Sequence, residues 1–352
     1  LLRMSCYILV INPGSTSTKI AVFDGEREVF SKTLTLEENQ LDLPLFPEQY
    51  LIRKRQILRA LADSGIEPNQ LSAIAARGGR LRPLSSGVYR INDRMLKDAR
   101  AGLQGVHPAN TAVVIASEIA FENRIEAFTV DPISVDEMSE WAKITGIRDI
   151  TRNSLSHALN MKAIARRAAS QLGKSYEEAK IIVAHLGGGS SVSAHLQGKM
   201  VDLYNSDKEG PFAVERAGAL PTHELADFAR SHDDYLHHLA HAGGLYSHFQ
   251  TRDVEKIVEM ARTGDNRAVV VLQAYIYNIA KYIFSLLAVF GGYPDALAIT
   301  GGVVKSEFVR TALLEKLGKG FRVFLFPGEF EMESLASGVY RVITGREKAL
   351  EY

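Results

Sequence analysis

Cysteine is almost absent from this sequence, since Cys6 is the only one among 352 residues. A single cysteine cannot form an intramolecular disulfide, and it cannot supply the thiolates of a cysteine-rich zinc site. The sequence therefore lacks the disulfide framework of many small secreted domains. We expect a protein of the reducing cytoplasm.

A charge excess of either sign is also absent, because 41 Lys and Arg residues balance 41 Asp and Glu residues. A basic field that would attract nucleic acid or an anionic membrane surface is therefore not expected. No apolar run approaches the roughly 20 residues of a membrane-spanning helix, and the opening residues lack a signal-peptide pattern. The sequence predicts neither a nucleic-acid partner nor a membrane.

The composition that remains, 46% hydrophobic and 23% charged, is typical of a globular protein, and the length suggests about two domains. An apolar run at residues 7–11, a small-residue turn and a second run at 20–25 predict a strand, a turn and a strand. The same order recurs at residues 181–186, 187–191 and 192–195. This internal repeat predicts a duplicated α/β fold with a cleft between the copies.

Further elements follow from apolar spacing. Helical spacing predicts helices over residues 48–64, 110–122, 157–172 and 268–290. Short apolar runs that stop at Gly, Pro or Asp predict strands over residues 71–76, 125–130 and 296–300.

Three turns of this chain have the small side chains that let backbone N–H groups approach a phosphate. The first is 12–19, which ends in Lys19 and lacks the Walker A spacing, so an ordinary hairpin is the alternative. The second contains Gly187, Gly188 and Gly189, where a tight bend is the alternative. The third, Gly301-Gly302-Val303, follows a strand and precedes a helical stretch. Together the turns predict a nucleotide site.

These elements carry motifs that resemble the acetate and butyrate kinase family, and within it the butyrate kinases most of all. The motifs run in the family's order: 10–19, 76–79, 106–110, 130–132, 156–160, 185–189, 209–216 and 300–302. The resemblance implies two duplicated actin-like, ribonuclease H-like α/β domains with an interdomain nucleotide cleft. The start of the second copy places the domain boundary near residues 148–152. This gives an N-terminal acyl-substrate and phosphate-binding domain at 1–149, with a C-terminal helix at about 335–352, and a nucleotide-binding domain at 150–334.

The same resemblance implies catalytic roles for four residues. Arg77 would pair with the acyl carboxylate, and Arg216 and His157 would stabilise the transferred phosphoryl group. Asp131 would lie near the metal. Read without the family, Arg77 is a surface arginine, Arg216 forms a salt bridge with Glu215, His157 begins a helix and Asp131 belongs to a turn.

The implied cofactors are ATP or ADP with Mg²⁺. Asn12, Asp131 and Glu333 match the metal site, and Glu329 and Glu331 are alternatives to Glu333 because they lie close in sequence. The nucleotide residues implied are Asn12, Gly14, Ser15, Thr16, Ser17, Lys19, His185, Gly187, Gly188, Gly189, Arg252, Gly301, Gly302 and Val303.

The substrate is implied by a departure from the acetate kinases, which have two valines where this chain has Gly78 and Gly79. The lost side-chain volume predicts room for extra methylene groups, each worth about 0.8 kcal/mol when buried. We therefore expect phosphorylation of butyrate to an acyl phosphate by direct in-line transfer. A branched short-chain acid and a non-catalytic nucleotide-binding regulator are the alternatives.

Two further patterns have purely structural interpretations, which we favour. Six histidines between His223 and His248 could hold zinc, but the neighbouring acidic residues favour a solvated or subunit-facing helix. The apolar helix 269–290 is typical of a core or a dimer contact, and the family resemblance implies a homodimer or a larger homo-oligomer.

Overall fold

The computed structural model describes residues 6–352, so residues 1–5, which were searched above for a signal peptide, lie outside the described residues. Internal contacts divide the chain into two compact units. The first joins the N-terminal part up to Asp136 to Phe330–Tyr352, and the second is Glu137–Glu329. The domain boundaries proposed from the sequence, at 149 and about 335, stay a proposal.

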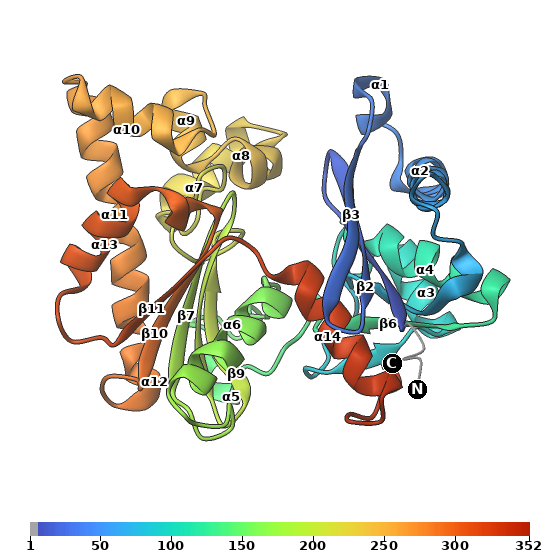
Figure 1. Cartoon of the computed structure of the whole chain (residues 1–352). Coiled ribbons are helices and arrows are strands. Elements are labelled where there is room, and N and C mark those ends of the chain that lie inside the picture. Colours follow the sequence, from blue (N-terminus) through green and yellow to red (C-terminus); the bar gives the residue numbers. More distant parts are fainter. Residues whose placement is uncertain (1–5) are drawn as a thin grey trace. The chain divides into compact units, whose positions relative to one another are not determined.

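The first unit is built on a six-stranded sheet in the order β3-β2-β1-β4-β6-β5 (Figure 1). β1, β4 and β6 are parallel, whereas β2, β3 and β5 are antiparallel to their neighbours. Residues 8–11 of β1 are fully buried, because central strands covered on both faces need apolar runs. The strands are β1 (Tyr7–Pro13), β2 (Ser17–Asp24), β3 (Arg27–Thr35), β4 (Leu71–Ala76), β5 (Val88–Arg90) and β6 (Glu126–Val130).

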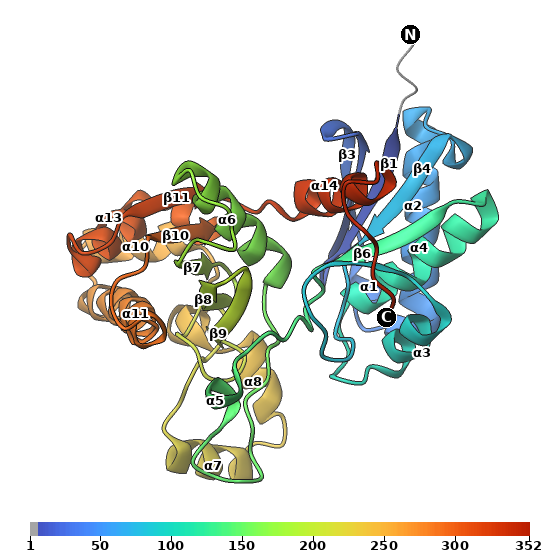
Figure 2. The ribbon, with the colours of Figure 1, turned by 90° about the horizontal axis from the view of Figure 1, so that it is seen from below.

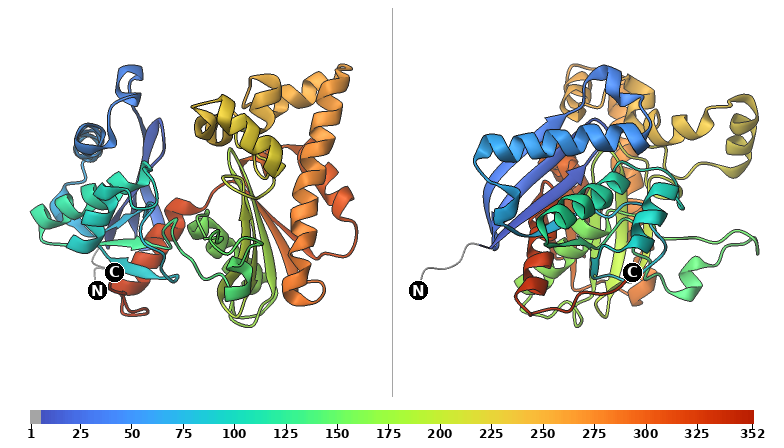
Figure 3. Two further views of the ribbon diagram at one scale, coloured as in Figure 1. Left: turned by 180° about the vertical axis from the view of Figure 1, so that it is seen from behind. Right: turned by 90° about the vertical axis from the view of Figure 1, so that its right-hand side faces the viewer.

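Helices cover both faces of this sheet. α4 (Ala109–Asn123) packs on one face of β1, β4 and β6, and α14 (Glu331–Ile343) packs on the other (Figure 2). α2 (Tyr50–Ser64), the long light-blue helix of Figure 3, packs against β3 and α4. The other helical segments are α1 (Glu38–Leu41), η1 (Leu45–Gln49), η2 (Pro68–Gln70) and α3 (Asp93–Ala101).

The second unit repeats this plan in a five-stranded sheet of order β11-β10-β7-β8-β9. Three antiparallel strands are followed by two that run parallel to the first, as in β1, β2, β3, β4 and β6. The internal repeat predicted from the sequence is therefore confirmed as a repeat of topology. The strands are β7 (Ile181–Leu186), β8 (Ser190–Leu196), β9 (Lys199–Asn205), β10 (Ala296–Gly301) and β11 (Val323–Pro327).

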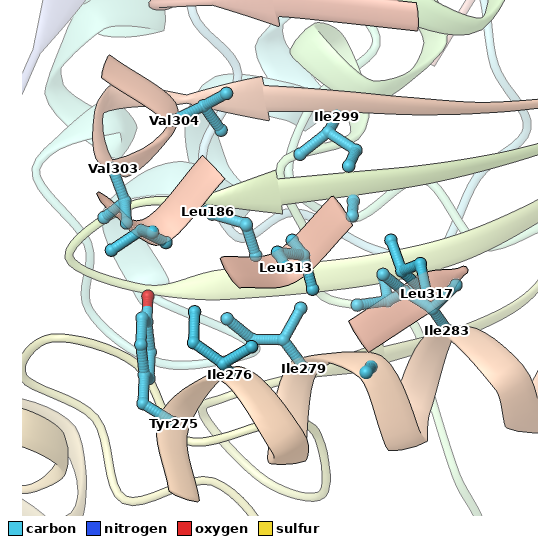
Figure 4. Packing of buried hydrophobic residues seen from close by; sticks show 14 of the residues in the cluster. Leu186, Tyr275, Ile276, Ile279, Ile283, Ile299, Val303, Val304, Leu313 and Leu317 are labelled. Atoms are coloured by element: carbon cyan, nitrogen blue, oxygen red, sulfur yellow. The ribbon is translucent and has the colours of Figure 1, made fainter. Parts of the chain in front are cut away.

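Helices also cover both faces of the second sheet. α6 (Ala158–Gln171) packs against β7 and β10, and α11 (Asn266–Ser285) lies on the opposite face. Figure 4 shows Tyr275, Ile276, Ile279 and Ile283 of α11 directed at apolar side chains from the sheet and α13. The other helices are α5 (Glu140–Lys143), α7 (Thr222–Ser231), α8 (Tyr235–His241), α9 (Gly244–Phe249), α10 (Val254–Arg262), α12 (Leu287–Phe290), η3 (Gly302–Lys305) and α13 (Glu307–Leu317).

The expectation that no segment is long and apolar enough to cross a membrane is wrong, because one helical segment has the required length and composition. α11 and α12 together, Asn266–Phe290, form a 25-residue helical segment whose most apolar 18 residues have a mean hydropathy of 1.4. Such a helix is weak evidence for a membrane, since a core helix passes the same test, and one face of α11 packs into the core of its unit.

The predicted central strands and long helices are confirmed to within three residues at each end, and the helix predicted over 268–290 is divided into α11 and α12 at Leu286. The C-terminal helix expected from about residue 335 begins earlier, at Glu331, and ends at Ile343. After it, Leu350 forms an isolated bridge with Tyr89 of β5, so the last residues return to the first sheet as extended chain.

Candidate active site

Three of the predicted site residues of the first unit lie at the carboxyl ends of neighbouring parallel strands. Asn12 is near the end of β1, Arg77 directly follows β4 and Asp131 directly follows β6. Parallel strands end at one edge of a sheet, which is where open α/β sheets bind ligands. The fold therefore gathers these residues at one edge.

Arg77 is held by two other side chains of this edge. One guanidinium nitrogen, Nη1, donates to Asn12 Oδ1 at 3.1 Å and lies 3.2 Å from Glu331 Oε2. Asn12 donates to the same Glu331 oxygen at 2.8 Å. The Arg77 side chain is 18% exposed, so the interpretation as a plain surface arginine is wrong. Within the described residues its other side-chain N–H donors have no partner, which leaves them available to a ligand.

Glu331, and not Glu333, is the glutamate that accepts a hydrogen bond from Asn12. Glu331 is the first residue of α14 and is 6% exposed. Glu333 lies two positions later, about 200° around the helix, and is exposed. Asn12 thus contacts Glu331, one of the alternatives to Glu333, and the choice of the acid at the metal stays a proposal. The sequence left this choice open because Glu329, Glu331 and Glu333 lie close together in it.

Asp131 has a backbone conformation that is uncommon for a residue with a side chain. Its φ is 39°, in the left-handed region, and it is 2% exposed. The carboxylate accepts from Ser86 Oγ at 2.5 Å and from the Gly87 N–H at 2.9 Å. Outliers of this kind occur at sites where the surroundings fix a functional group. Asp131 is thus held in a fixed position, and its functional role stays a proposal.

The first of the predicted phosphate turns connects β1 to β2. The Gly14 N–H donates to Ser17 O at 2.7 Å and closes the turn. Ser15 and Thr16 at its tip are exposed, and so is Lys19 on β2. Behind the turn lies Arg53 of α2, a fully buried residue that sequence reasoning missed.

The second unit brings together two predicted histidines and an asparagine. His157, the residue before α6, stacks on His185 at the end of β7 with ring centroids 4.1 Å apart. His157 Nδ1 is 3.0 Å from Ser191 Oγ, and the amide of Asn160 is 2.9 Å from His185 Nδ1. His185 is 2% exposed and is the buried ring of the stacked pair, whereas His157 is partly exposed.

The glycine turn after β7 is packed against the predicted arginine. A Cβ atom at Gly189 would overlap the guanidinium of Arg216, so a larger residue there would require that side chain to move. Arg216 Nη1 forms an ion pair with Asp207 Oδ1 at 2.6 Å, and Arg216 Nε is buried with no hydrogen-bond partner in the described residues. A buried donor without a partner is costly unless a ligand completes it.

Glu215 does not pair with its neighbour Arg216, so the local salt bridge considered as an alternative is wrong. Glu215 pairs instead with Nε of Arg252 at 2.5 Å. The Arg252 guanidinium lies 4.4 Å from the centroid of the Tyr246 ring. Arg252 is 55% exposed and stands at the rim of a pocket.

That pocket has a volume of about 500 Å³ and lies entirely in the second unit. Among its lining residues are five that the sequence predicted for the nucleotide, namely Gly187, Gly188, Arg252, Gly302 and Val303. Gly301, at φ 104°, lies so close to the Leu186 carbonyl that a Cβ atom would overlap it. The strand ends of β7 and β10 therefore meet at this pocket without bulky side chains.

The argument that Gly78 and Gly79 open space for extra methylene groups is wrong. A Cβ atom at Gly78 would overlap Pro132, and one at Gly79 would overlap the side chain of Asn110. The volume that the glycines leave is already filled, because β4, β6 and α4 approach closely there. Gly78 and Gly79 allow this close packing. They are therefore no evidence for the chain length of the carboxylic acid substrate.

Four of the six histidines from His223 to His248 contact one another, namely His232, His237, His238 and His241. His232 stacks on Phe228 with centroids 4.0 Å apart, and the His237 and His241 rings are 5.4 Å apart. Across residues 6–352, no three histidine, cysteine or acidic side chains are grouped so as to hold a metal ion.

Comparison with solved structures defines the fold. The chain is similar to acetate kinase from Porphyromonas gingivalis, with a TM-score of 0.77 at 19% identity over 97% of this chain and 100% of that one. It is also similar to a propionate kinase from Francisella tularensis subsp. tularensis SCHU S4, with a TM-score of 0.76 at 19% identity over 95% and 98%. The duplicated α/β fold is thus the actin-like fold of these kinases.

Sequence comparison defines the family. The profile of the acetokinase family matches residues 137–324. The chain is 41% identical to Butyrate kinase 1 from Clostridium acetobutylicum, a match that covers 98% of this chain and 99% of that protein. This protein belongs to the acetokinase family.

Proposed function

We propose that this protein is a butyrate kinase, which transfers the terminal phosphoryl group of ATP to butyrate and reversibly forms butyryl phosphate and ADP. The observation that carries the proposal is the 41% identity to Butyrate kinase 1 over nearly the full length of both proteins. The residues at the strand ends of both units support it, since they suit the binding of anions.

The chemistry needs cations more than it needs a base. A carboxylate with a pKa near 4 is ionised at neutral pH, so its oxygen attacks phosphorus without losing a proton. One P–O bond forms to the acid, and the bond from the terminal phosphorus to the bridging oxygen breaks as ADP leaves. Two anions must be held together, and catalysis is mainly positioning and charge stabilisation.

Arg77 is proposed to bind the carboxylate of the acid. Asn12 and Glu331 fix one nitrogen of its guanidinium, and the remaining donors suit the two oxygens of a carboxylate. Arg216 and His157 are proposed to stabilise the phosphoryl group in transfer. The buried, unpartnered Nε of Arg216 supports this role, because an anionic oxygen would complete its hydrogen bonding.

Mg²⁺ is proposed to accompany the nucleotide. The oxygens of Asn12, Asp131 and Glu331 are the ligand type that Mg²⁺ prefers, and this ion often takes only one or two protein carboxylates beside phosphates and waters. The ion supplies neutralisation of charge on the phosphate oxygens. Asn12, Asp131 and Glu331 would hold it, with Glu331 in the place first given to Glu333.

A hydroxamate assay tests the function. Purified protein with ATP and Mg²⁺ is incubated with acetate, propionate, butyrate, isobutyrate or isovalerate, and acyl phosphate is trapped with hydroxylamine. We expect the highest kcat/KM with butyrate and loss of product when EDTA is added. A higher value with a branched acid would favour the branched-chain kinase, and no product with any acid would favour a regulator.

Transfer is proposed to be direct. Incubation with γ-labelled ATP in the absence of acid should leave no label on the protein, whereas stable protein-bound label would contradict the direct route. We also propose a cytoplasmic homodimer or larger homo-oligomer. The single cysteine supports the compartment, and light scattering of the purified protein measures the assembly.

A further inference from the structure

Arg53 is a buried arginine that no part of the proposed mechanism uses. It lies on α2 and has no solvent exposure. Its guanidinium is directed at the turn between β1 and β2, which is the first turn predicted to hold phosphate. Nη2 donates to the carbonyls of Gly14 at 3.0 Å and Ser15 at 3.3 Å, and Nη1 donates to the Ser17 carbonyl at 3.0 Å.

The remaining contacts of Arg53 are neutral as well. Nη1 also donates to Thr18 Oγ1 at 2.8 Å, Nη2 also donates to Gln49 Oε1 at 3.2 Å, and Nε has no partner. Within residues 6–352 no carboxylate forms an ion pair with this guanidinium. Burial lowers the pKa of Arg53 to about 10, so the side chain is still charged at neutral pH.

A buried charge without a counter-ion is expensive, and buried arginines are normally paired with acids. Neutral carbonyl and hydroxyl dipoles satisfy the Nη donors of Arg53, leave Nε without a partner and leave the net positive charge uncompensated. An anion bound at the turn would compensate it. This is the first reason to connect Arg53 with a ligand.

The second reason is the orientation of the peptide planes. In a trans peptide the N–H points opposite to the C=O of the same unit. Because the Gly14 and Ser15 carbonyls point at Arg53, the N–H groups of Ser15 and Thr16 point away from it. Both residues are exposed, and neither N–H donates a hydrogen bond within the described residues. Successive outward N–H groups form a concave site for anions.

We propose that Arg53 is the positioning residue of the phosphoryl-binding turn. It fixes the N–H groups of Ser15 and Thr16 toward a phosphoryl oxygen and places a permanent positive charge behind them. The proposal rests on the proposed function, since it concerns the phosphoryl group that ATP and the acyl phosphate share. Arg53 itself does not touch the ligand.

Steady-state kinetics in both directions test the proposal. Arg53→Met removes the charge while keeping an unbranched apolar chain, and Arg55→Met removes an exposed arginine from the same helix. We expect Arg53→Met to lower kcat/KM for ATP and for butyryl phosphate at least about tenfold, the loss typical of a charged hydrogen bond. KM for butyrate, which has no phosphoryl group, should stay within about twofold, and Arg55→Met should match the wild type.

Two milder variants separate positioning from folding. Arg53→Lys keeps the charge without the planar fork, and Thr18→Val removes one acceptor while leaving Arg53 in place. Both should shift kcat/KM for ATP in the same direction but less than Arg53→Met, with unchanged circular dichroism. If Arg53→Met does not fold, the kinetics of Arg53→Lys and Thr18→Val test the proposal in its place. Wild-type kinetics in every folded variant would overturn the proposal. A KM for butyrate that rises as much as the KM for ATP would also overturn it.

Failure of the proposed function is a different result. If the wild-type protein makes no acyl phosphate at all, titration calorimetry with ATP and AMP still tests Arg53. The proposal then expects the variants to weaken ATP binding and to leave AMP binding unchanged, because AMP lacks the terminal phosphates. Equal weakening of both nucleotides, or no weakening, would contradict it.

Discussion

Arg77 and Arg152 are both largely buried, at 18% and 14% exposure of the side chain, yet their surroundings differ. Arg152 donates to Asp202, Glu209 and two backbone carbonyls, so both ends of its guanidinium are used within the fold. Arg77 uses one nitrogen for Asn12 and Glu331. An arginine that is fixed but incompletely bonded suits a ligand, whereas a saturated one stabilises the fold.

Arg77→Ala should therefore act on the acid more than on the nucleotide. We expect KM for butyrate to rise at least about tenfold, because a charge-assisted pair with a carboxylate contributes roughly 1.5–3 kcal/mol. KM for ATP should change by less than about twofold if Arg77 binds only the acid. Initial rates with each substrate varied in turn measure both values.

Arg90→Ala is the matched control for Arg77→Ala. Arg90 belongs to the same unit and pairs with Glu126, but its side chain is 44% exposed. Exposed ion pairs contribute little, so the control should keep wild-type kinetics. Unchanged kinetics with butyrate in Arg77→Ala would remove Arg77 from the proposed site.

His195 predicts how stability depends on pH. It is fully buried between Tyr176 and Ser193, and burial, followed by the charges of Lys162 and Arg166, lowers its pKa well below 6.5. Below pH 6.5 the unfolded chain binds a proton at this histidine that the folded protein does not. The free energy of unfolding should therefore fall with decreasing pH, by about 1 kcal/mol per pH unit from this group.

Urea unfolding between pH 7.5 and 5.5 measures this slope. His195→Asn should flatten it relative to the wild type, even if the variant is less stable at pH 7.5. His223→Asn is the comparison, because the His223 side chain is exposed. An identical slope in the wild type and His195→Asn would show that other groups produce the pH dependence.

At the scale of elements, the close approach of β4, β6 and α4 explains why glycines follow Arg77. Asn110 of α4 accepts from the Arg80 N–H at 2.9 Å and donates to the Ala99 carbonyl at 2.9 Å, so its side chain is held firmly. A methyl group at Gly79 has no space beside it. The glycines therefore fix the position of Arg77 through packing.

Gly79→Ala should lower stability and leave the order of acid preference unchanged. We expect a loss of about 1–3 kcal/mol, the usual cost of overpacking, together with lower activity toward every acid. Thermal unfolding and the hydroxamate assay measure the two effects. Gly146→Ala, at a glycine with nothing within 4 Å of an added Cβ, is the control. A selective gain toward acetate would instead support a pocket wall at Gly79.

The sequence predicted the elements that are buried and apolar, because burial on both faces demands continuous hydrophobic runs. It missed β3, most of whose residues are exposed, since an edge strand with little burial has no apolar pattern. Arg77 and His157 could be named from motifs. Arg53 could not, because its role depends on α2 packing behind a turn some 35–39 residues earlier in the chain.

At the scale of the whole molecule, the last segment of the chain belongs to the first unit. Phe330–Tyr352 returns to that unit after Glu137–Glu329 has formed the second one. α14 contributes the buried residues Leu335, Ala336 and Val339, and Tyr352 donates to Asp98 at 3.0 Å. The same segment supplies Glu331 to Arg77, so the site residues of the first unit depend on the end of the chain.

A chain truncated after residue 329 should therefore keep its second unit and lose the first. Burying one leucine or valine contributes roughly 1.5–3 kcal/mol, so removing α14 takes away much of the 5–15 kcal/mol typical of a domain. We expect fragment 137–329 to unfold cooperatively on its own and fragment 1–136 to lack a cooperative transition. Circular dichroism during heating measures both.

Joining residues 1–136 to residues 330–352 through a flexible linker supplies the missing face of the sheet. This fusion should regain a cooperative transition, and Leu335→Asp within it should abolish that transition, because a charge would then be buried against β1 and β4. Ser337→Asp, at a half-exposed position of the same helix, should not. A cooperative transition in fragment 1–136 alone would mean that the first sheet is stable without α14, and that the returning segment serves only to bring Glu331 to Arg77.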